Sequence, residues 1–294
     1  TLDQHELKAF ILTGQKWYEI DDIQDKNIAE TIFSNTEEEQ LDRIQGAYGG
    51  YWRFPRMIDY CYLVNPYFPT RQMQKEMKAN FNVLLSSYPS GLSVQNMLAG
   101  KLFNVEEKNI LTGNGAAELI RALVPGISGS IGITYPTFNE YPESFTKNQI
   151  VPFIPANFKY TQKDLAALTK KCDVLLVINP DNPSGNYIPA KEMIELLEYL
   201  KIQNKKIILD ESFIDFCGFE GDQSLLRQDI INTYPNLILI RSLSKSFGIP
   251  GLRLGVLVSG DADIIKQVRF NLPIWNINSF AEFFLQIIGN YIKD

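Results

Sequence analysis

Short runs of apolar residues alternate with longer amphipathic segments along most of the chain. From about residue 51 onward, apolar runs that end in polar residues predict β-strands within 109–115, 129–136, 173–180, 205–213, 236–245 and 253–260. Apolar positions at helical spacing predict helices within 93–103, 116–124, 190–203 and 261–270. This alternation predicts an α/β fold, in which a mostly parallel sheet is covered by helices on both faces.

The first 50 residues have a different texture. Residues 1–34 are short and mixed, and residues 35–50 are polar and acidic, which is typical of a linker or a solvated helix. The sequence contains no run of about 18 apolar residues, so no membrane span is expected. It begins at Thr1 without a signal-peptide pattern, and we expect a fragment or a processed chain.

Composition narrows the possible chemistry. The 294 residues suffice for one large or two ordinary domains, and the net charge of −6 argues against nucleic-acid binding. The cysteines Cys61, Cys172 and Cys217 are far apart, which fits a cytoplasmic protein without disulfides or a cysteine metal motif. Because His5 is the single histidine, neither a Ser–His–Asp triad nor a His-rich metal site is expected. Lysine, aspartate, tyrosine or a cofactor must therefore carry any catalysis.

Candidate ligand-binding residues follow the predicted strands, where parallel sheets bind their ligands. In "TGNGAAELI", Gly113 and Gly115 nearly match G-x-G-x-x-G, but Glu118 replaces the third glycine. The stretch is either a tight strand-to-helix turn or a phosphate site formed by the N–H groups of Ala116 and Ala117. A Rossmann-type dehydrogenase is a rival interpretation at this point.

Two further strands end in polar residues. Asn182, in the loop 179–185, can donate to a ligand oxygen, although this segment could also be a plain irregular loop. Asp210 follows Ile-Ile-Leu, where a carboxylate needs a cationic partner unless it caps a helix.

The stretch "SLSKSFGIPGLRLG" spans residues 242–255 and contains a lysine between serines. Ser242 and Ser244 can donate hydroxyl groups, and Arg253 can bind a phosphate through two hydrogen bonds. Burial and the nearby Arg253 would lower the pKa of Lys245, which favours the free amine needed to attack an aldehyde.

Together these groups meet the requirements of pyridoxal phosphate (PLP). Its aldehyde needs a lysine, its ring nitrogen a carboxylate, its ring oxygen a donor, and its phosphate a helix N-terminus, hydroxyls and arginine. Gly248 and Gly251 would let the backbone come close to the bound group.

Several motifs, in order, resemble the fold-type I PLP enzymes of the class I/II aminotransferases. They are "LVNPYFPT", "YPSG", "TGNGAAELIRAL", "YPTFNEY", "NPDNPSG", "LDESF", "SLSKSFGIPGLRLG" and "NINSFAEFFLQ". The branches most similar to the chain are histidinol-phosphate aminotransferase and threonine-phosphate decarboxylase. The resemblance runs from about Tyr60 to the C-terminus and implies the large domain of a PLP-dependent transferase.

The resemblance assigns roles to individual residues. Lys245 would capture the cofactor and move the proton at the substrate α-carbon, Asp210 would pair with the ring nitrogen, Asn182 would donate to the ring oxygen, and Phe138 would stack on the ring. The phosphate would be held by Ala116, Ala117, Ser242, Ser244 and Arg253. Tyr88 would reach the phosphate of a neighbouring subunit, which implies a homodimer.

The chain departs from the family at two points. Aminotransferases of this family usually have a tyrosine three residues after the aspartate, where this chain has Phe213, a feature closer to the decarboxylase branch. The family also continues beyond Asp294 into a small domain that carries the arginine for the substrate carboxylate, so that arginine cannot be named.

The N-terminal segment "GQKWYEIDDIQDKNIAE" resembles the tail of a sugar-phosphate or phosphocholine nucleotidyltransferase. In that family late aspartates help to hold Mg²⁺, and the matching region here contains Asp21, Asp22 and Asp25. Trp17 and Tyr18 could instead pack against the second domain. This resemblance implies a nucleotidyltransferase fused to an aminotransferase, with this chain beginning near the junction and containing no complete transferase site.

We therefore expect a tail at 1–34, a linker at 35–50, an N-terminal arm at 51–75, a PLP-binding large domain at 76–277, and the start of a helix toward a missing small domain at 278–294. The expected activity is PLP-dependent amino-group transfer between an amino acid, phosphorylated or not, and a 2-oxo acid or aldehyde. Small-molecule donors and acceptors are the expected partners. The alternatives are a decarboxylase of a phosphorylated amino acid, the dehydrogenase named above, and a non-catalytic fragment.

Overall fold

A computed structural model describes residues 11, 13–54, 57–218 and 223–292, so His5 lies outside the described residues. The chain divides into two compact units, residues 1–63 and 64–294. Within the first unit, the described part forms the helices α1 (Ile23–Ile32) and α2 (Glu37–Gly46) and the short 3-10 turn Tyr51–Arg53. The segment expected as a linker or solvated helix thus contains α2, none of whose residues is buried.

The second unit is built on a seven-stranded sheet with the order β1-β7-β6-β5-β4-β2-β3. Its strands are β1 (Ile110–Asn114), β2 (Ile131–Thr134), β3 (Ile150–Phe153), β4 (Val174–Ile178), β5 (Lys206–Asp210), β6 (Leu237–Ser242) and β7 (Leu254–Ser259). All six predicted strands are confirmed. The sequence did not reveal β3, whose Pro152 is tolerated because β3 forms an edge of the sheet.

The sheet is mostly parallel, as predicted, with one reversed strand. β7 is antiparallel to both of its neighbours, β1 and β6, so the other six strands share one direction. Their carboxyl ends therefore lie at the same edge of the sheet. Every polar residue singled out at a strand end is brought to that edge.

The order of the strands excludes the Rossmann dehydrogenase. In that fold the strand before the glycine-rich turn pairs with the next parallel strand, whereas here β1 lies at the far edge and pairs only with the reversed β7. The chain continues through helix α6 (Gly115–Leu123) to β2, which lies near the opposite edge of the sheet. The glycine-rich turn therefore does not belong to a Rossmann unit.

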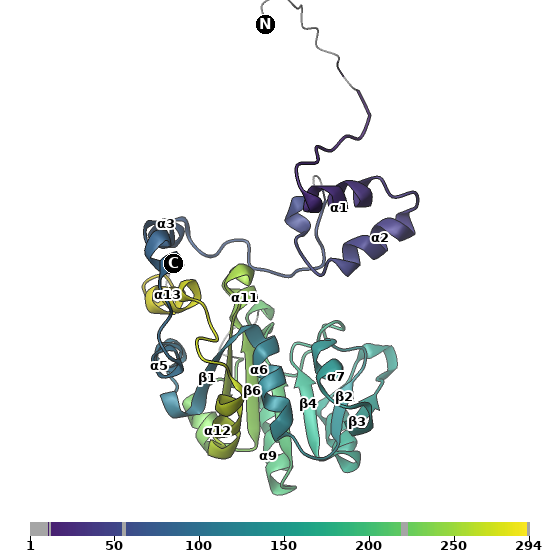
Figure 1. Ribbon diagram of the computed structural model, residues 1–294. Coiled ribbons are helices and arrows are strands. Elements are labelled where there is room, and N and C mark those ends of the chain that lie inside the picture. The colour runs from purple at the N-terminus through teal and green to yellow at the C-terminus, as the bar shows by residue number, and fades with distance from the viewer. Residues whose placement is uncertain (1–10, 12, 55–56, 219–222, 293–294) are drawn as a thin grey trace, which may run out of the picture. The chain divides into compact units, whose positions relative to one another are not determined.

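Helices cover both faces of the sheet because its central strands bury both faces (Figure 1). Leu175 and Val177 of β4 pack into one core, while Leu176 and Ile178 pack into the other, as the alternation of side chains along a strand requires. One core includes α6, α7 (Glu140–Ser144) and α12 (Ala262–Asn271). The other includes α5 (Leu92–Phe103), α8 (Gln162–Leu168), α9 (Ala190–Ile202), α10 (Gln228–Thr233) and α13 (Ser279–Ile287).

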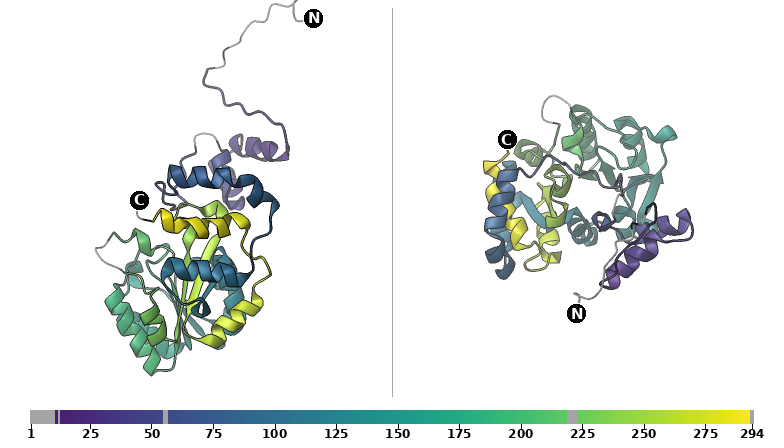
Figure 2. Two further views of the ribbon diagram at one scale, coloured as in Figure 1. Left: turned by 90° about the vertical axis from the view of Figure 1, so that its left-hand side faces the viewer. Right: turned by 90° about the horizontal axis from the view of Figure 1, so that it is seen from above.

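Helix α13 packs against α5 and against the pair formed by α3 (Arg71–Ala79) and α4 (Phe81–Ser86), as Figure 2 shows from the side. Phe280 of α13 contacts Phe81, with ring centroids 5.5 Å apart. Asn278 caps α13 by accepting from Ala281 N–H at 2.9 Å. The C-terminal helix is thus an integral part of this unit.

Candidate active site

Asp210 ends β5 and is almost fully buried, with 3% of its surface exposed. The Tyr141 hydroxyl donates to Oδ2 at 2.8 Å, and the Ser212 N–H donates to Oδ1 at 2.8 Å. No Lys or Arg side chain of the described residues forms an ion pair with this carboxylate. Asp210 does not cap a helix either, since the next helical turn is Ile214–Phe216 and its N-cap is Phe213. A buried carboxylate in this state fits a cationic group on a ligand.

Lys245 lies in the short helix α11 (Leu243–Ser246), directly after β6. Burial is the main cause that lowers the pKa of the Lys245 amine, the charge of Arg253 lowers it further, and Asp210 opposes both. The amine also lies 4.8 Å from the centre of the Phe213 ring. The structure therefore brings the predicted lysine, aspartate and arginine into electrostatic range of one another.

Arg253 lies against the N-terminus of α6. A Cβ on Gly115 would lie 2.6 Å from Nη2 of Arg253, so a larger residue there would force the guanidinium to shift. Gly115 also has a left-handed backbone, with φ 76°. The turn before α6 thus combines the positive end of a helix, the first-turn N–H groups of Ala116 and Ala117, and an arginine, which together suit a phosphate.

Glu118, which broke the glycine fingerprint, has a structural role in this turn. Its Oε2 accepts from Asn114 N–H at 2.7 Å and from the side chain of Asn276 at 3.1 Å. The two interpretations left open for the turn are therefore compatible: the turn is tight, and it leads directly into the first turn of α6.

Ser242 and Ser244 are both buried on the β6–α11 connection. The backbone N–H of Ser242 donates to the Ser212 hydroxyl at 2.9 Å, which ties β6 to the turn after Asp210. The Ser244 hydroxyl has no hydrogen-bond partner among the described residues. A buried hydroxyl without a partner beside Lys245 fits an anionic ligand oxygen.

The glycines after Lys245 do not both act as expected. Gly248 has φ 61°, and a Cβ there would lie 1.7 Å from the carbonyl oxygen of Phe68. The close approach at Gly248 is therefore made by the chain's own backbone at Phe68, whereas we expected a bound group there. Asn65 completes this contact, since its N–H and side chain donate to the carbonyls of Lys245 and Ser246, each at 2.9 Å. Gly251 has open space around it.

Asn182 lies in the loop after β4, and this loop begins beside Asp210 through a 2.9 Å bond from Asn179 N–H to Asp210 O. The neighbouring Asp181 is buried and accepts from Ser184 N–H at 3.3 Å. Burial raises the pKa of the Asp181 carboxyl. The structure fixes the start of the loop without giving the Asn182 side chain a contact to the lysine.

Phe138 is 40% exposed, and its ring lies edge-on to Tyr141 at 6.3 Å. Phe138 is therefore placed next to Tyr141, the residue that holds Asp210.

Tyr88 is 79% exposed and stacks on Trp275, with ring centroids 4.3 Å apart. Sequence reasoning missed Tyr141, Asn65 and Trp275, although Tyr141 belongs to the same motif, "YPTFNEY", as Phe138.

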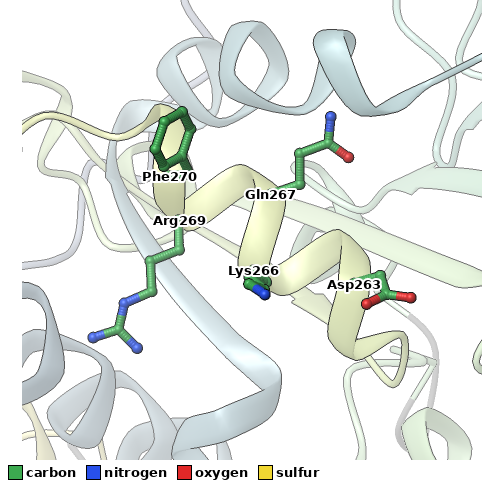
Figure 3. Close-up of a pocket in the computed structure, with 5 residues that line it drawn as sticks. All are labelled: Asp263, Lys266, Gln267, Arg269 and Phe270. Carbon is green, nitrogen blue, oxygen red and sulfur yellow. The ribbon is translucent and has the colours of Figure 1, made fainter.

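A hollow of about 500 Å³ lies on α12, and none of the candidate site residues lines it (Figure 3). Its lining consists of Asp263, Lys266, Gln267, Arg269 and Phe270, all on one helix. A single helix is convex and supplies no opposite wall, so we assign no ligand to this hollow.

The aspartates of the first unit serve local structure. Asp22 caps α1 by accepting from the N–H groups of Gln24 and Asp25, and Asp25 accepts from the Tyr18 hydroxyl at 3.2 Å. Within the described ranges, no group of three or more His, Cys, Asp or Glu side chains could hold a metal ion. Likewise, no helix in the described part is long and apolar enough to cross a bilayer.

The fold is that of the PLP-dependent enzymes of fold type I, and comparison with known proteins specifies the family. The family described as "Aminotransferase class I and II" matches residues 59–285, and the chain belongs to it. Pyridoxal phosphate is the cofactor of this family. The predicted resemblance to the class I/II aminotransferases and the predicted fold class are thereby confirmed.

Two curated relatives illustrate the range of the family. The chain is 28% identical over 291 residues to CMP-5'-(3-aminopropyl)phosphonate synthase of Streptomyces rubellomurinus, covering 98% of this chain and 45% of that protein. It is 33% identical over 247 residues to L-serine phosphate decarboxylase of Sulfurospirillum multivorans, covering 78% and 62%. The chain therefore spans between about half and three fifths of these relatives.

Among solved structures, the histidinol-phosphate aminotransferase of Clostridium acetobutylicum matches with a TM-score of 0.68 and 27% identity. The match covers 81% of this chain and 72% of that one. Relatives thus include both aminotransferases and decarboxylases.

Proposed function

We propose that the chain binds PLP and transfers an amino group between an amino acid, phosphorylated or not, and a 2-oxo acid or aldehyde. The observation that carries this proposal is the buried Asp210 carboxylate, held by Tyr141 and Ser212, in electrostatic range of the desolvated Lys245 amine. When bound, PLP supplies an electron sink for charge that develops at the substrate α-carbon.

We assign the contacts to the cofactor's ring, and the movement of the proton, to individual residues of the chain. Asp210 would pair with the ring nitrogen, where its charge favours the protonated form, and Asn182 would donate to the ring oxygen. Phe138 would cover one face of the ring. Lys245 would hold the cofactor, and its amine, whose pKa is lowered, is suited to moving the proton at the substrate α-carbon.

The phosphate group requires a separate set of contacts. We assign them to the N–H groups of Ala116 and Ala117, the hydroxyls of Ser242 and Ser244, and the Arg253 guanidinium. The partnerless Ser244 hydroxyl and the space that Gly115 leaves for Arg253 support this assignment. Tyr88, exposed in one chain, would complete the phosphate site of a second copy in a homodimer.

A second candidate is decarboxylation of a phosphorylated amino acid. It is favoured by Phe213, whose ring faces the Lys245 amine at 4.8 Å without offering a hydroxyl, and by the similarity to L-serine phosphate decarboxylase. The two reactions leave different products from the same substrate. The assay supplies PLP, a phosphorylated amino acid and a 2-oxo acid as the amino acceptor. It compares formation of the oxo acid derived from the donor with release of CO₂, and absence of both products contradicts catalysis at this site.

We also propose that the chain is part of a bifunctional protein with a nucleotidyltransferase. The similarity to CMP-5'-(3-aminopropyl)phosphonate synthase extends through the first unit, as 98% of this chain is covered. Sequencing the gene on both sides of this segment tests the fusion, which is wrong if no nucleotidyltransferase is encoded there.

A cytoplasmic location fits the three free cysteines at positions 61, 172 and 217.

A further inference from the structure

Trp275 combines an unusual backbone with an exposed aromatic contact. Its φ is 54°, in the left-handed region that bulky residues rarely adopt, and its ring is 46% exposed. The ring stacks on Tyr88 with an interplanar angle of 27° and a centroid distance of 4.3 Å. A strained residue that stacks at the surface contributes little to core packing, so the strain indicates a functional role.

The residue after Trp275 fixes this conformation. Asn276 is buried, and its side chain donates to Thr112 O at 2.9 Å and to Glu118 Oε2 at 3.1 Å. Since Glu118 also accepts from Asn114 N–H, the backbone at Trp275 is tied to the turn that precedes α6. The same turn carries the amides assigned to the phosphate.

The other side of the stack is anchored as well. Ser90, two residues after Tyr88, donates through its N–H and its hydroxyl to the buried Glu282 at 2.6 and 2.7 Å. Its carbonyl accepts from Gln95 at 2.7 Å. The backbone near Tyr88 is therefore fixed, while its ring, 79% exposed, relies on Trp275 for a contact surface.

We propose that Trp275 is a positioning residue that acts through Tyr88. In a pair of identical chains, it holds the Tyr88 side chain in the orientation in which its hydroxyl reaches the phosphate bound by the partner. This inference rests on the proposed function, which supplies the second copy and the phosphate. Holding the ring in advance lowers the entropy cost of that contact, and an aromatic pair contributes about 2- to 12-fold in an equilibrium constant.

The test measures the PLP dissociation constant by absorbance titration in a double-mutant cycle. Trp275→Asn removes the ring but keeps a residue that tolerates the left-handed backbone, and Trp275→Phe keeps an aromatic surface. Tyr88→Ala removes the partner ring. Phe270→Ala, at a residue that is 88% exposed on α12, is the matched control for loss of an exposed aromatic side chain.

We expect Trp275→Asn and Tyr88→Ala each to weaken PLP binding about five-fold. The double variant should be no weaker than either single one, and Trp275→Phe and Phe270→Ala should bind like the unaltered protein. Additive effects of the two single variants, or an effect of Tyr88→Ala without one of Trp275→Asn, would overturn the inference while leaving the proposed function intact. Failure of the unaltered protein to bind PLP would overturn both.

Mixing subunits gives a second readout. Lys245→Ala chains cannot be linked to the cofactor by borohydride but carry an intact Tyr88–Trp275 pair. Trp275→Asn chains keep Lys245 but lack the Trp275 ring. If the pair acts on the partner subunit, mixed dimers should regain tight PLP sites, measured as borohydride-fixed cofactor at low PLP concentration. No gain on mixing would show that Trp275 does not act across the dimer.

Discussion

The Tyr141 hydroxyl donates a 2.8 Å hydrogen bond to Oδ2 of Asp210, so the carboxylate at the end of β5 is held by a helix on one face of the sheet. Tyr141 is fully buried, and desolvation together with the Asp210 charge raises the pKa of its hydroxyl well above the usual value. The tyrosine therefore stays protonated and remains a donor. The hydrogen bond from Tyr141 keeps Oδ2 of Asp210 in a fixed position.

Asp210→Asn tests the charge of this carboxylate. The amide is similar in shape and should leave the fold intact, whereas loss of the charge should slow turnover by about 100-fold. Steady-state kinetics with the unaltered protein as reference measures the effect. Unchanged turnover would contradict the assignment of Asp210 to the ring nitrogen.

Tyr141→Phe tests the hydrogen bond itself. The substitution keeps the ring but leaves a buried carboxylate oxygen without its donor, which should lower the free energy of unfolding by about 1–3 kcal/mol. Urea denaturation of the cofactor-free protein measures this change. A variant as stable as the unaltered protein would show that the bond contributes nothing.

The lowered pKa of Lys245 predicts how stability depends on pH without cofactor. The unfolded chain keeps a proton on this lysine up to the ordinary pKa of 10.5, while the folded chain loses it at lower pH. The unfolded state therefore binds more protons between these two pKa values, and the free energy of unfolding rises with pH across that window.

Lys245→Met should remove this contribution and raise the stability of the cofactor-free protein at neutral pH, since methionine has no charge to desolvate. Thermal unfolding over a series of pH values measures both effects. A variant that is less stable at neutral pH would contradict a desolvated Lys245 amine.

Gly115→Ala tests the contact between Arg253 and the turn before α6. The new Cβ would meet Nη2 of Arg253 at 2.6 Å on a backbone with φ 76°, which should cost about 1–3 kcal/mol and weaken phosphate binding. Gly251→Ala is the matched control, because nothing lies within 4 Å of its Cβ position. Equal stability and PLP affinity of the two variants would refute the role of Gly115.

Phe213→Tyr tests what decides between the two candidate reactions. The added hydroxyl lies on the ring that faces the Lys245 amine and supplies the group that family aminotransferases usually have there. We expect a larger ratio of oxo acid to CO₂ than in the unaltered protein. An unchanged ratio would show that Phe213 does not influence the outcome.

Much of the architecture followed from local patterns. The apolar runs located six of the seven strands, and helix spacing located α5, α6, α9 and α12, because burial on one or both faces imposes these periods. The reversed direction of β7 and the edge position of β1 were not predictable, since strand pairing depends on contacts between distant segments. β3 was hidden by its proline.

The candidate site shows the same difference between what local sequence patterns predict and what contacts between distant segments decide. The proximity of Asp210, Lys245 and Arg253 was predictable because each follows a strand end or lies in a recognisable motif. The packing of Phe68 on Gly248 joins residues 180 positions apart, and nothing near Gly248 in the sequence indicates which segment will fill that space. The left-handed Trp275 is likewise set by the anchoring of Asn276 on a distant turn.

The most direct measurement of the central claim is a peptide map of the protein after incubation with PLP and reduction by borohydride. The account predicts that the cofactor's mass is added to the peptide containing Lys245, and that Lys245→Ala abolishes this addition. Attachment at another lysine, or attachment that persists in Lys245→Ala, would contradict it.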